Sequence, residues 1–352
     1  MIAKKIIFPR ANEAELVDVE VQEPASGEVL VKTVISSVSP GTERANIIGN
    51  DSVAGAKAPE VKFPRSVGYS SAGEVVAVGE GVQEFSVGDR VIVFHGKHIS
   101  YNLAKTKNVV KIDDDVSYED AAAVFISTFP LAAVRKTGLE IGESMLVMGL
   151  GLLGQFAVRL ARAAGAAPLI AADPNEKRRA IALAGGADIA LDPLAPDFAE
   201  KVKALTKGGV NTAIEVTGVG AGLDETLDCM APMGRVALLG CTRDKNFTID
   251  YYRKVHFPGI TLIGAHTNAR PQTESYPHHF THRDDIGAVL KLIAGKRLSF
   301  AGLEQNSHAP TECAEVYRDL IQNKDFPLLT QFDWRLLNSP QSSAANSKAV
   351  LV

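Results

Sequence analysis

Two patterns of hydrophobic and polar positions divide the chain. In residues 1 to about 120, apolar and polar side chains alternate over 28–34, and short apolar stretches at 73–79 and 85–93 are bounded by glycine. A period of two is typical of half-buried strands, and short strands separated by glycine predict a small antiparallel barrel. From about residue 121, apolar runs alternate with segments of helical period. This second pattern predicts a parallel sheet whose faces are covered by helices.

The second pattern resolves into strands and helices in turn. A helix is expected after the first strand, because Leu153, Phe156 and Leu160 fall on one stripe. Another helix is expected over about 285–294. The tail 338–352 is polar and built of small residues, which is typical of disorder. The expected strands lie at 144–148, 168–173, 212–216, 235–240 and 260–264, with a further helix at 177–184.

A glycine-rich turn joins the first of these strands to its helix. It reads Gly149-x-Gly151-x-x-Gly154, with Leu152 and Leu153 between the last two glycines. The glycines permit a tight turn, close approach of the backbone to a pyrophosphate and close packing of the helix on the strand. The N-terminus of the helix adds free N–H groups and a partial positive charge. The turn therefore predicts a site for the diphosphate of a dinucleotide.

Asp173 stands at the end of the next strand, 22 residues after Gly151. A carboxylate there can accept both ribose hydroxyls of an adenosine and would repel a 2′-phosphate, so NAD is favoured over NADP. The alternative role is a helix N-cap, because Pro174 follows and proline suits the first helical position. NADP remains the alternative cofactor because of Arg178, since a guanidinium near the ribose could bind the 2′-phosphate.

Several segments also resemble a known family. The segments 73–79 (GEVVAVG) and 85–91 (FSVGDRV) look like the barrel signature of the medium-chain dehydrogenase/reductase superfamily, whose zinc alcohol dehydrogenases are best known. The run 120–123 (DAAA), the glycine-rich turn and the run 215–218 (EVTG) fall where that family would place them. The resemblance extends over nearly the whole chain.

The resemblance implies an α/β fold with two domains. A GroES-like β-barrel catalytic domain would be built from both chain ends, 1–125 and 269–337. A Rossmann domain, a doubly wound parallel sheet that binds the nucleotide, would be inserted at 126–268. Thr217 and Gly240 would then lie at the cofactor. The family usually dimerises through edge strands, so a homodimer or homotetramer is expected.

The resemblance fails where zinc members of the family bind metal. In place of their Cys-Gly-Thr-Asp motif the chain reads Pro-Gly-Thr-Glu at 40–43, and in place of Gly-His-Glu it reads Gly-Tyr-Ser at 68–70. The third ligand position falls near Ser127, and the four-cysteine structural lobe is missing between 93 and 101. Proline offers no donor atom, and a hydroxyl replaces thiolate or imidazole poorly. We therefore expect no zinc.

Without a Lewis acid, hydride transfer at a carbinol carbon needs another group to take up charge on the oxygen. Tyr69 is the first candidate, because it stands at a vacated ligand position; the alternative is that it only fills the space of the metal. Glu43 is the second, with a salt bridge to Arg44 as its alternative. Thr42 could orient a substrate hydroxyl. His266 follows the last strand and could contact substrate or transfer a proton, or else cap a helix.

Further substrate contacts are predicted at Ser39, Ser70 and Ser127, and at His98, for which a structural role is the alternative. The segments 251–254 and 266–271 supply many hydrogen-bonding groups. If these segments face the cleft, the substrate is polar, such as a polyol, a sugar or a cyclitol.

Three histidines crowd one segment after the last strand, at His278, His279 and His282. His278 and His282 are four residues apart, so on a helix they could share a metal. Pro277 opens the run, however, and residues 283–285 look like a cap for the next helix. A loop of solvated or substrate-facing histidines is therefore favoured.

Composition limits which partners and which cellular compartment are expected for this chain. The chain has 37 basic and 41 acidic residues and a net charge of −4, so nucleic acid and anionic lipid are not expected partners. No apolar run approaches the roughly 20 residues of a membrane span, and the N-terminal run is too short for a signal peptide. The three cysteines are scattered, which favours a reducing compartment. We expect a cytoplasmic protein.

These patterns favour a zinc-independent oxidoreductase that moves hydride between NAD and the carbinol or carbonyl of a hydroxylated small molecule. A quinone or enone reductase is the first alternative, although such enzymes usually prefer NADPH. The run 37–43 is also similar to a motif of bacteriochlorophyllide dehydrogenases. The third alternative is a non-catalytic structural protein that keeps the nucleotide fold.

Overall fold

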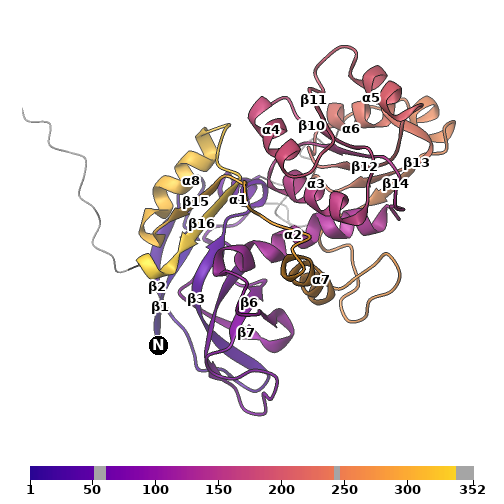
Figure 1. Cartoon of the computed structure of the whole chain (residues 1–352). Helices are drawn as coiled ribbons and strands as arrows, with labels where there is room; N and C mark the ends of the chain where they lie inside the picture. The colour runs from indigo at the N-terminus through magenta and orange to yellow at the C-terminus, as the bar shows by residue number, and fades with distance from the viewer. Residues whose placement is uncertain (51–60, 242–245, 338–352) are drawn as a thin grey trace, which may run out of the picture.

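The computed structural model describes residues 1–50, 61–241 and 246–337. The predicted disordered tail at 338–352 lies outside these residues. The described chain has two parts, a parallel α/β part and a largely antiparallel part, with helix α2 (Tyr118–Lys136) between them (Figure 1). The α/β prediction is confirmed.

The parallel part is a six-stranded sheet with the order β11-β10-β9-β12-β13-β14. Counted from β9, this order is 3-2-1-4-5-6, that of a doubly wound nucleotide-binding fold. Its strands pair in parallel throughout, as the alternating pattern predicts. The strands are β9 (Met145–Met148), β10 (Leu169–Ala172), β11 (Ile189–Leu191), β12 (Val210–Glu215), β13 (Met230–Leu238) and β14 (Thr261–Gly264); the helices are α3 (Leu152–Ala164), α4 (Glu176–Ala184), α5 (Phe198–Thr206) and α6 (Gly220–Asp228).

The antiparallel part is built from both ends of the chain. A seven-stranded sheet has the order β15-β16-β3-β5-β6-β8, with β7 also paired to β3, and a three-stranded sheet has the order β2-β1-β4. Figure 1 shows the yellow C-terminal elements beside the indigo N-terminal ones. The strands are β1 (Ile2–Phe8), β2 (Glu15–Glu20), β3 (Glu28–Ser37), β4 (Arg65–Ser66), β5 (Ser70–Val78), β6 (Arg90–Phe94), β7 (Tyr101–Lys105), β8 (Val109–Lys111), β15 (Gln305–His308) and β16 (Leu329–Asp333); α1 (Pro40–Ile47) and α8 (Cys313–Gln322) pack together.

One predicted strand is shorter than expected. The apolar stretch 85–93 becomes a strand only from Arg90, because the residues before it form a turn. The Asp89 carboxylate accepts the backbone N–H of Ser86 at 2.8 Å, and Gly88 has a φ of +93°. A left-handed glycine and a side-chain acceptor both favour a turn over extended chain.

The longest helix of the described chain, α2 (Tyr118–Lys136), is not foreseen by the pattern. Its N-cap is Ser117, whose hydroxyl accepts the backbone N–H of Asp120 at 3.0 Å. Every residue from 121 to 134 is buried, so the helix shows no polar face that would reveal its period. The predicted domain boundary at 125/126 falls inside it.

Two further helices correct the expectations near the C-terminus. Helix α7 (His282–Ala294) begins three residues before the predicted start, capped by Thr281, whose hydroxyl accepts the N–H of Asp284 at 3.2 Å. Helix α8 lies in a stretch for which no helix is predicted. Among the helices of the described chain, none is long and apolar enough to cross a membrane.

Candidate functional site

A cavity of about 700 Å³ lies where the glycine-rich turn faces helix α1. From the antiparallel part it is lined by Ser39 and by the first residues of α1, among them Thr42. From the parallel part it is lined by predicted cofactor residues: Gly149, Gly151, Leu152, Leu153, Asp173, Arg178, Thr217 and Gly240. Loops after β9, β10, β12 and β13 thus meet at one edge of the sheet, beside its topological switch point.

The three glycines of the turn have different surroundings. Gly149 has a φ of +96°, a conformation that side chains rarely adopt. A Cβ on Gly154 would lie 1.9 Å from the carbonyl oxygen of Gly149, so this glycine permits the helix to pack on the turn. A Cβ on Gly151 would meet no described protein atom within 4 Å. Gly151 therefore faces open space at the N-terminus of α3, which is the space a pyrophosphate needs.

Asp173 is buried and hydrogen-bonded to backbone on both sides. One carboxylate oxygen accepts the N–H of Leu150 at 2.8 Å, and the other accepts the N–H of Asn175 at 2.9 Å. The alternative role as an N-cap is wrong, because the cap of α4 is Asn175, whose side chain accepts the N–H of Arg178. Asp173 instead ties the glycine-rich turn to the end of β10. Arg178 lines the cavity and donates to the carbonyl of Lys324 at 3.3 Å.

The loops after β12 and β13 contribute Thr217 and Gly240 to the lining of this cavity. Burial raises the pKa of Glu215, whose carboxylate accepts the backbone N–H groups of Thr217 at 2.7 Å and Gly218 at 3.2 Å. A Cβ on Gly240 would lie 2.4 Å from the nitrogen of Gly218, so only glycine fits there. These hydrogen bonds and the close approach of Gly240 to Gly218 fix the backbone of the loop at Thr217.

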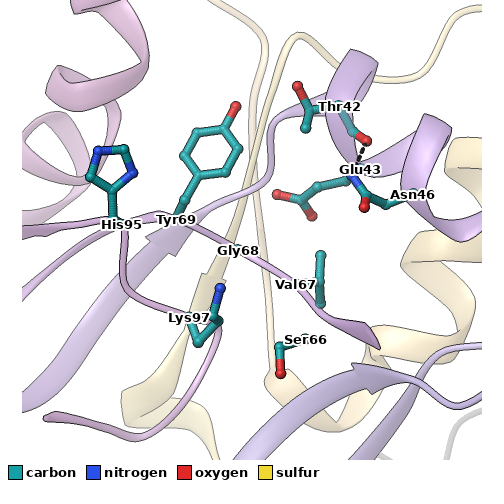
Figure 2. Close-up of a pocket in the computed structure, with 9 residues that line it drawn as sticks. All are labelled: Thr42, Glu43, Asn46, Ser66, Val67, Gly68, Tyr69, His95 and Lys97. Carbon is teal, nitrogen blue, oxygen red and sulfur yellow. Dashed lines mark hydrogen bonds between the residues drawn. The ribbon is translucent and has the colours of Figure 1, made fainter. Parts of the chain in front are cut away.

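A second cavity, of about 180 Å³, adjoins the first, and Thr42 lines both. Figure 2 shows Tyr69 and His95 along one side, Thr42 and Glu43 along the other, and Lys97 below. Three catalytic candidates, Tyr69, Glu43 and Thr42, therefore lie around one space. The lining is completed by Asn46, Ser66, Val67 and Gly68.

The Tyr69 hydroxyl is buried and makes no hydrogen bond to any described residue. Its ring packs against Phe125 and Phe129, with centroids 5.8 and 5.9 Å away. Burial raises the pKa of Tyr69, while the neighbouring hydroxyls of Ser39 and Thr42 act in the opposite direction. The hydroxyl thus lies near these two side chains without a well-formed hydrogen bond to either. A buried polar atom of this kind calls for a ligand or water as its partner.

Glu43 is only 1% exposed, and its carboxylate accepts hydrogen bonds both from the residue before its own helix and from distant parts of the chain. The Tyr317 hydroxyl donates to one carboxylate oxygen at 2.6 Å, and the Ser39 N–H donates to the other at 3.0 Å. The His98 Nε2 lies 3.3 Å from both oxygens. Arg44 is not a partner, contrary to the proposed salt bridge, because its guanidinium donates to the carbonyl of Ile321.

His98 is fully buried, and its neighbours decide its neutral tautomer. The indole N–H of Trp334 donates to the Ser36 hydroxyl oxygen at 2.9 Å, so the Ser36 O–H is free to donate to His98 Nδ1 at 2.7 Å. Nε2 of a neutral His98 then carries the proton and donates to Glu43. Both ring nitrogens therefore have partners within the protein, which favours the structural role, and a substrate contact by His98 stays an untested prediction.

Other predicted residues lie away from the two cavities. The Ser70 hydroxyl is buried and donates to the carbonyl of Ala122 at 2.5 Å. The Ser127 hydroxyl, inside α2, donates to the carbonyl of Val124 at 2.7 Å. Neither hydroxyl lines these cavities, so the two predictions of substrate contact are not supported. His266 is exposed, and its Nδ1 accepts the N–H of Asn268 at 3.2 Å, so the structure does not bring it to Tyr69 either.

The histidine-rich segment is not a metal site in this structure. His278 lies before α7 with a φ of +66° and contacts the carbonyl of Arg135, whereas His282 is the first residue of the helix. The two therefore do not share a helix face. Burial lowers the pKa of His282 to about 3, and its ring packs 5.2 Å from that of His95.

Comparison with known proteins agrees with this geometry. The alcohol dehydrogenase GroES-like domain matches residues 25–118, and the zinc-binding dehydrogenase family matches 153–281. L-threonine 3-dehydrogenase of Pyrococcus horikoshii is 31% identical over 280 residues, which is 71% of this chain and 79% of that protein. The chain belongs to the medium-chain dehydrogenase/reductase superfamily. It is an alcohol dehydrogenase-like oxidoreductase.

Two further comparisons extend the family likeness. D-guloside 3-dehydrogenase of Escherichia coli is 26% identical over 293 residues, covering 78% of this chain and 83% of that protein. Benzyl alcohol dehydrogenase of Acinetobacter calcoaceticus superposes with a TM-score of 0.80 at 22% identity, covering 95% of this chain and 99% of the other. The latter shows a shared dehydrogenase fold.

At the positions where zinc members of the family bind metal, the described side chains do not fit a zinc ion. Within 1–50, 61–241 and 246–337, no three His, Cys, Asp or Glu residues come together to hold a metal ion. At the three expected ligand positions, Pro40 has no donor atom, Tyr69 presents a buried phenol, and Ser127 donates inside its own helix. No local motif in the sequence points to Tyr317, which donates to Glu43, or to Ser36 and Trp334, which are linked to Glu43 through His98, because these residues come together only in the folded chain.

Proposed function

We propose that this protein is a zinc-independent, NAD(H)-dependent oxidoreductase of polar, hydroxylated small molecules. It transfers hydride between the nicotinamide and a carbinol or carbonyl carbon. The observation that carries the proposal is that Thr42 lines both cavities, so the two lie next to each other. Thr42 thus stands between the nucleotide cradle of the larger cavity and the phenol of Tyr69 in the smaller one.

The larger cavity suits a nicotinamide dinucleotide. Gly151 leaves room for the pyrophosphate at the N-terminus of α3, whose free N–H groups favour an anion. Asp173 stands where the adenosine ribose would lie, and its negative charge disfavours a 2′-phosphate. A bound NAD supplies the hydride acceptor, and the chain supplies the positioning of its diphosphate and ribose.

The smaller cavity suits the reacting oxygen of the substrate. Because the pKa of Tyr69 is raised, its O–H remains protonated and donates to a carbonyl or developing alkoxide oxygen. In the direction of alcohol oxidation, the substrate proton would leave through a relay in which the Tyr69 hydroxyl and then that of Ser39 or Thr42 each accept one proton and donate their own, with water as the final acceptor. Glu43 contributes a fixed negative charge beside them.

Relatives support a polar substrate. Their names specify L-threonine, a D-guloside and (R,R)-butanediol, all of which carry hydroxyl groups. The lining of the smaller cavity is mostly polar, with Thr42, Asn46 and Ser66 among it. We also expect assembly into a homodimer or homotetramer, for which the outer edge of β14 offers an open strand.

Three measurements and one substitution test the proposal. NADH and NADPH binding is measured by fluorescence, zinc content by elemental analysis, and cofactor reduction or oxidation over polyols, sugars and enones. We expect NADH to bind more tightly than NADPH, zinc to be far below stoichiometric, and hydroxylated substrates to be turned over. Tyr69→Phe should lower kcat by about 100-fold, whereas Tyr251→Phe, on the exposed surface, should not. Indifference to NADH, stoichiometric zinc, or turnover of aliphatic enones alone would each contradict the proposal.

A further inference from the structure

The loop between β6 and β7 holds a lysine in a defined place at the smaller cavity. The side chain of Asn102, buried on β7, accepts the N–H of Lys97 at 2.9 Å and donates to its carbonyl at 3.2 Å. The next residue, His98, donates its backbone N–H to Val67 at 2.9 Å, and a Cβ on Gly68 would lie 2.5 Å from that nitrogen. The loop backbone is therefore clamped on two sides.

Lys97 has no anionic partner among the described residues. Lys97 is exposed, lines the cavity and forms no ion pair within the part of the chain that the structure describes. Figure 2 shows its Nζ directed toward the space beside Gly68 and Glu43. Partial burial lowers the pKa of Lys97, and the neighbouring ammonium of Lys5 lowers it further. Lys5 is likewise without an acidic partner in the described chain.

The positive charge of Lys97 also affects His95, which lines the same cavity. The pKa of His95, on the cavity lining, is lowered by burial and then by the charges of Lys97 and Arg270. The one carboxylate of the lining, Glu43, already accepts hydrogen bonds from Tyr317 and Ser39 and is not within ion-pair distance of Lys97. An anion entering beside Lys97 would thus meet an uncompensated cation.

We infer that Lys97 forms an anion subsite, so that the substrate carries a carboxylate or phosphate group together with the hydroxyl that is oxidised. This inference rests on the proposed function and narrows its substrate class to hydroxy acids, sugar acids or polyol phosphates. Lys97 binds the anionic group, Lys5 reinforces the local field, and the reacting oxygen lies toward Tyr69 and Thr42.

The kinetic test uses substrates that differ only in charge. D-gluconate is compared with D-sorbitol, and glycerol 3-phosphate with glycerol, which separates carboxylate from phosphate. We expect kcat/KM to favour at least one anionic member. In Lys97→Met that preference should fall by about 10- to 100-fold, as expected for loss of a charge-assisted hydrogen bond. Lys97→Arg should keep most of it. Lys4→Met is the matched control, since Lys4 pairs with Asp18 on the surface and should leave the preference unchanged.

A second test needs no turnover. Because its pKa is lowered, Lys97 should react with an acetylating reagent faster than Lys4, as followed by peptide mass spectrometry. D-gluconate or glycerol 3-phosphate should slow its acetylation several-fold, whereas D-sorbitol and glycerol should not. Equal protection by charged and neutral compounds, or an unchanged preference in Lys97→Met, would overturn the subsite. Protection by anions without any hydride transfer would instead contradict the proposed function and leave the subsite standing.

Discussion

The buried hydrogen bond between Tyr317 and Glu43 yields the sharpest test of the site. Tyr317→Phe removes one oxygen and keeps the ring, which packs 4.8 Å from Phe8 and 5.9 Å from Phe332. Burial and the nearby Glu43 charge raise the pKa of Tyr317, so its hydroxyl is a permanent donor to the carboxylate. The substitution thus deletes one hydrogen bond to a charged group that is 1% exposed.

The expected magnitude follows from that geometry. Hydrogen bonds to charged groups contribute about 1.5–3 kcal/mol to the free energy of unfolding. An unfolding entropy of roughly 2.1 cal/mol/K per residue, over 352 residues, converts this into a fall in Tm of about 2–4 °C. Since Glu43 lines the substrate cavity and not the cofactor cavity, kcat should fall by about tenfold while NADH affinity stays unchanged.

Unfolding can be followed by tryptophan fluorescence at one known position, because the chain has a single tryptophan. Trp334 donates to Ser36 in the same network, so its fluorescence reports unfolding of this sheet. Tyr118→Phe is the matched control: it removes a tyrosine hydrogen bond of 2.8 Å to Glu74 at the surface and should change stability by less than about 0.5 kcal/mol. If the two variants shift the fluorescence transition equally, the reasoning about Glu43 is refuted.

Three further outcomes follow from the same structure. Gly154→Ala should lower the free energy of unfolding by about 1–3 kcal/mol through steric overlap, whereas Gly151→Ala should leave it nearly unchanged and weaken NADH binding; equal effects on stability would argue against the cradle. His282 is neutral when folded because burial lowers its pKa to about 3, so stability is complete above about pH 6.5 and should fall by about 2 kcal/mol between pH 7.5 and 5; chemical denaturation of His282→Gln should show a smaller fall. Asp285→Asn removes the buried partner of two arginines and should cost about 3–5 kcal/mol at pH 7.5, and a loss below 1 kcal/mol in urea denaturation would refute that pairing.

The sequence alone determined the features that depend on neighbouring residues. The glycine-rich turn, the strand before it and the helix after it are contiguous, so their geometry follows from local backbone sterics and a short hydrophobic period. The alternation of strands and helices then leaves few topologies, and the parallel order observed is one of them. Family motifs along the chain also directed attention to Tyr69 and Thr42, which line the smaller cavity, while their catalytic role stays a prediction.

Only the tertiary structure decided which polar groups face the cavities. Ser127 and Ser70 stand in suitable places along the chain, yet packing turns their hydroxyls inward to backbone carbonyls. The Glu43 network joins residues more than 270 positions apart, and no local period encodes such a contact. Burial of a charge requires donors from whichever segments pack around it. Those segments are chosen by the fold as a whole, and this is why the partners of Glu43 and the uncompensated Lys97 became visible only there.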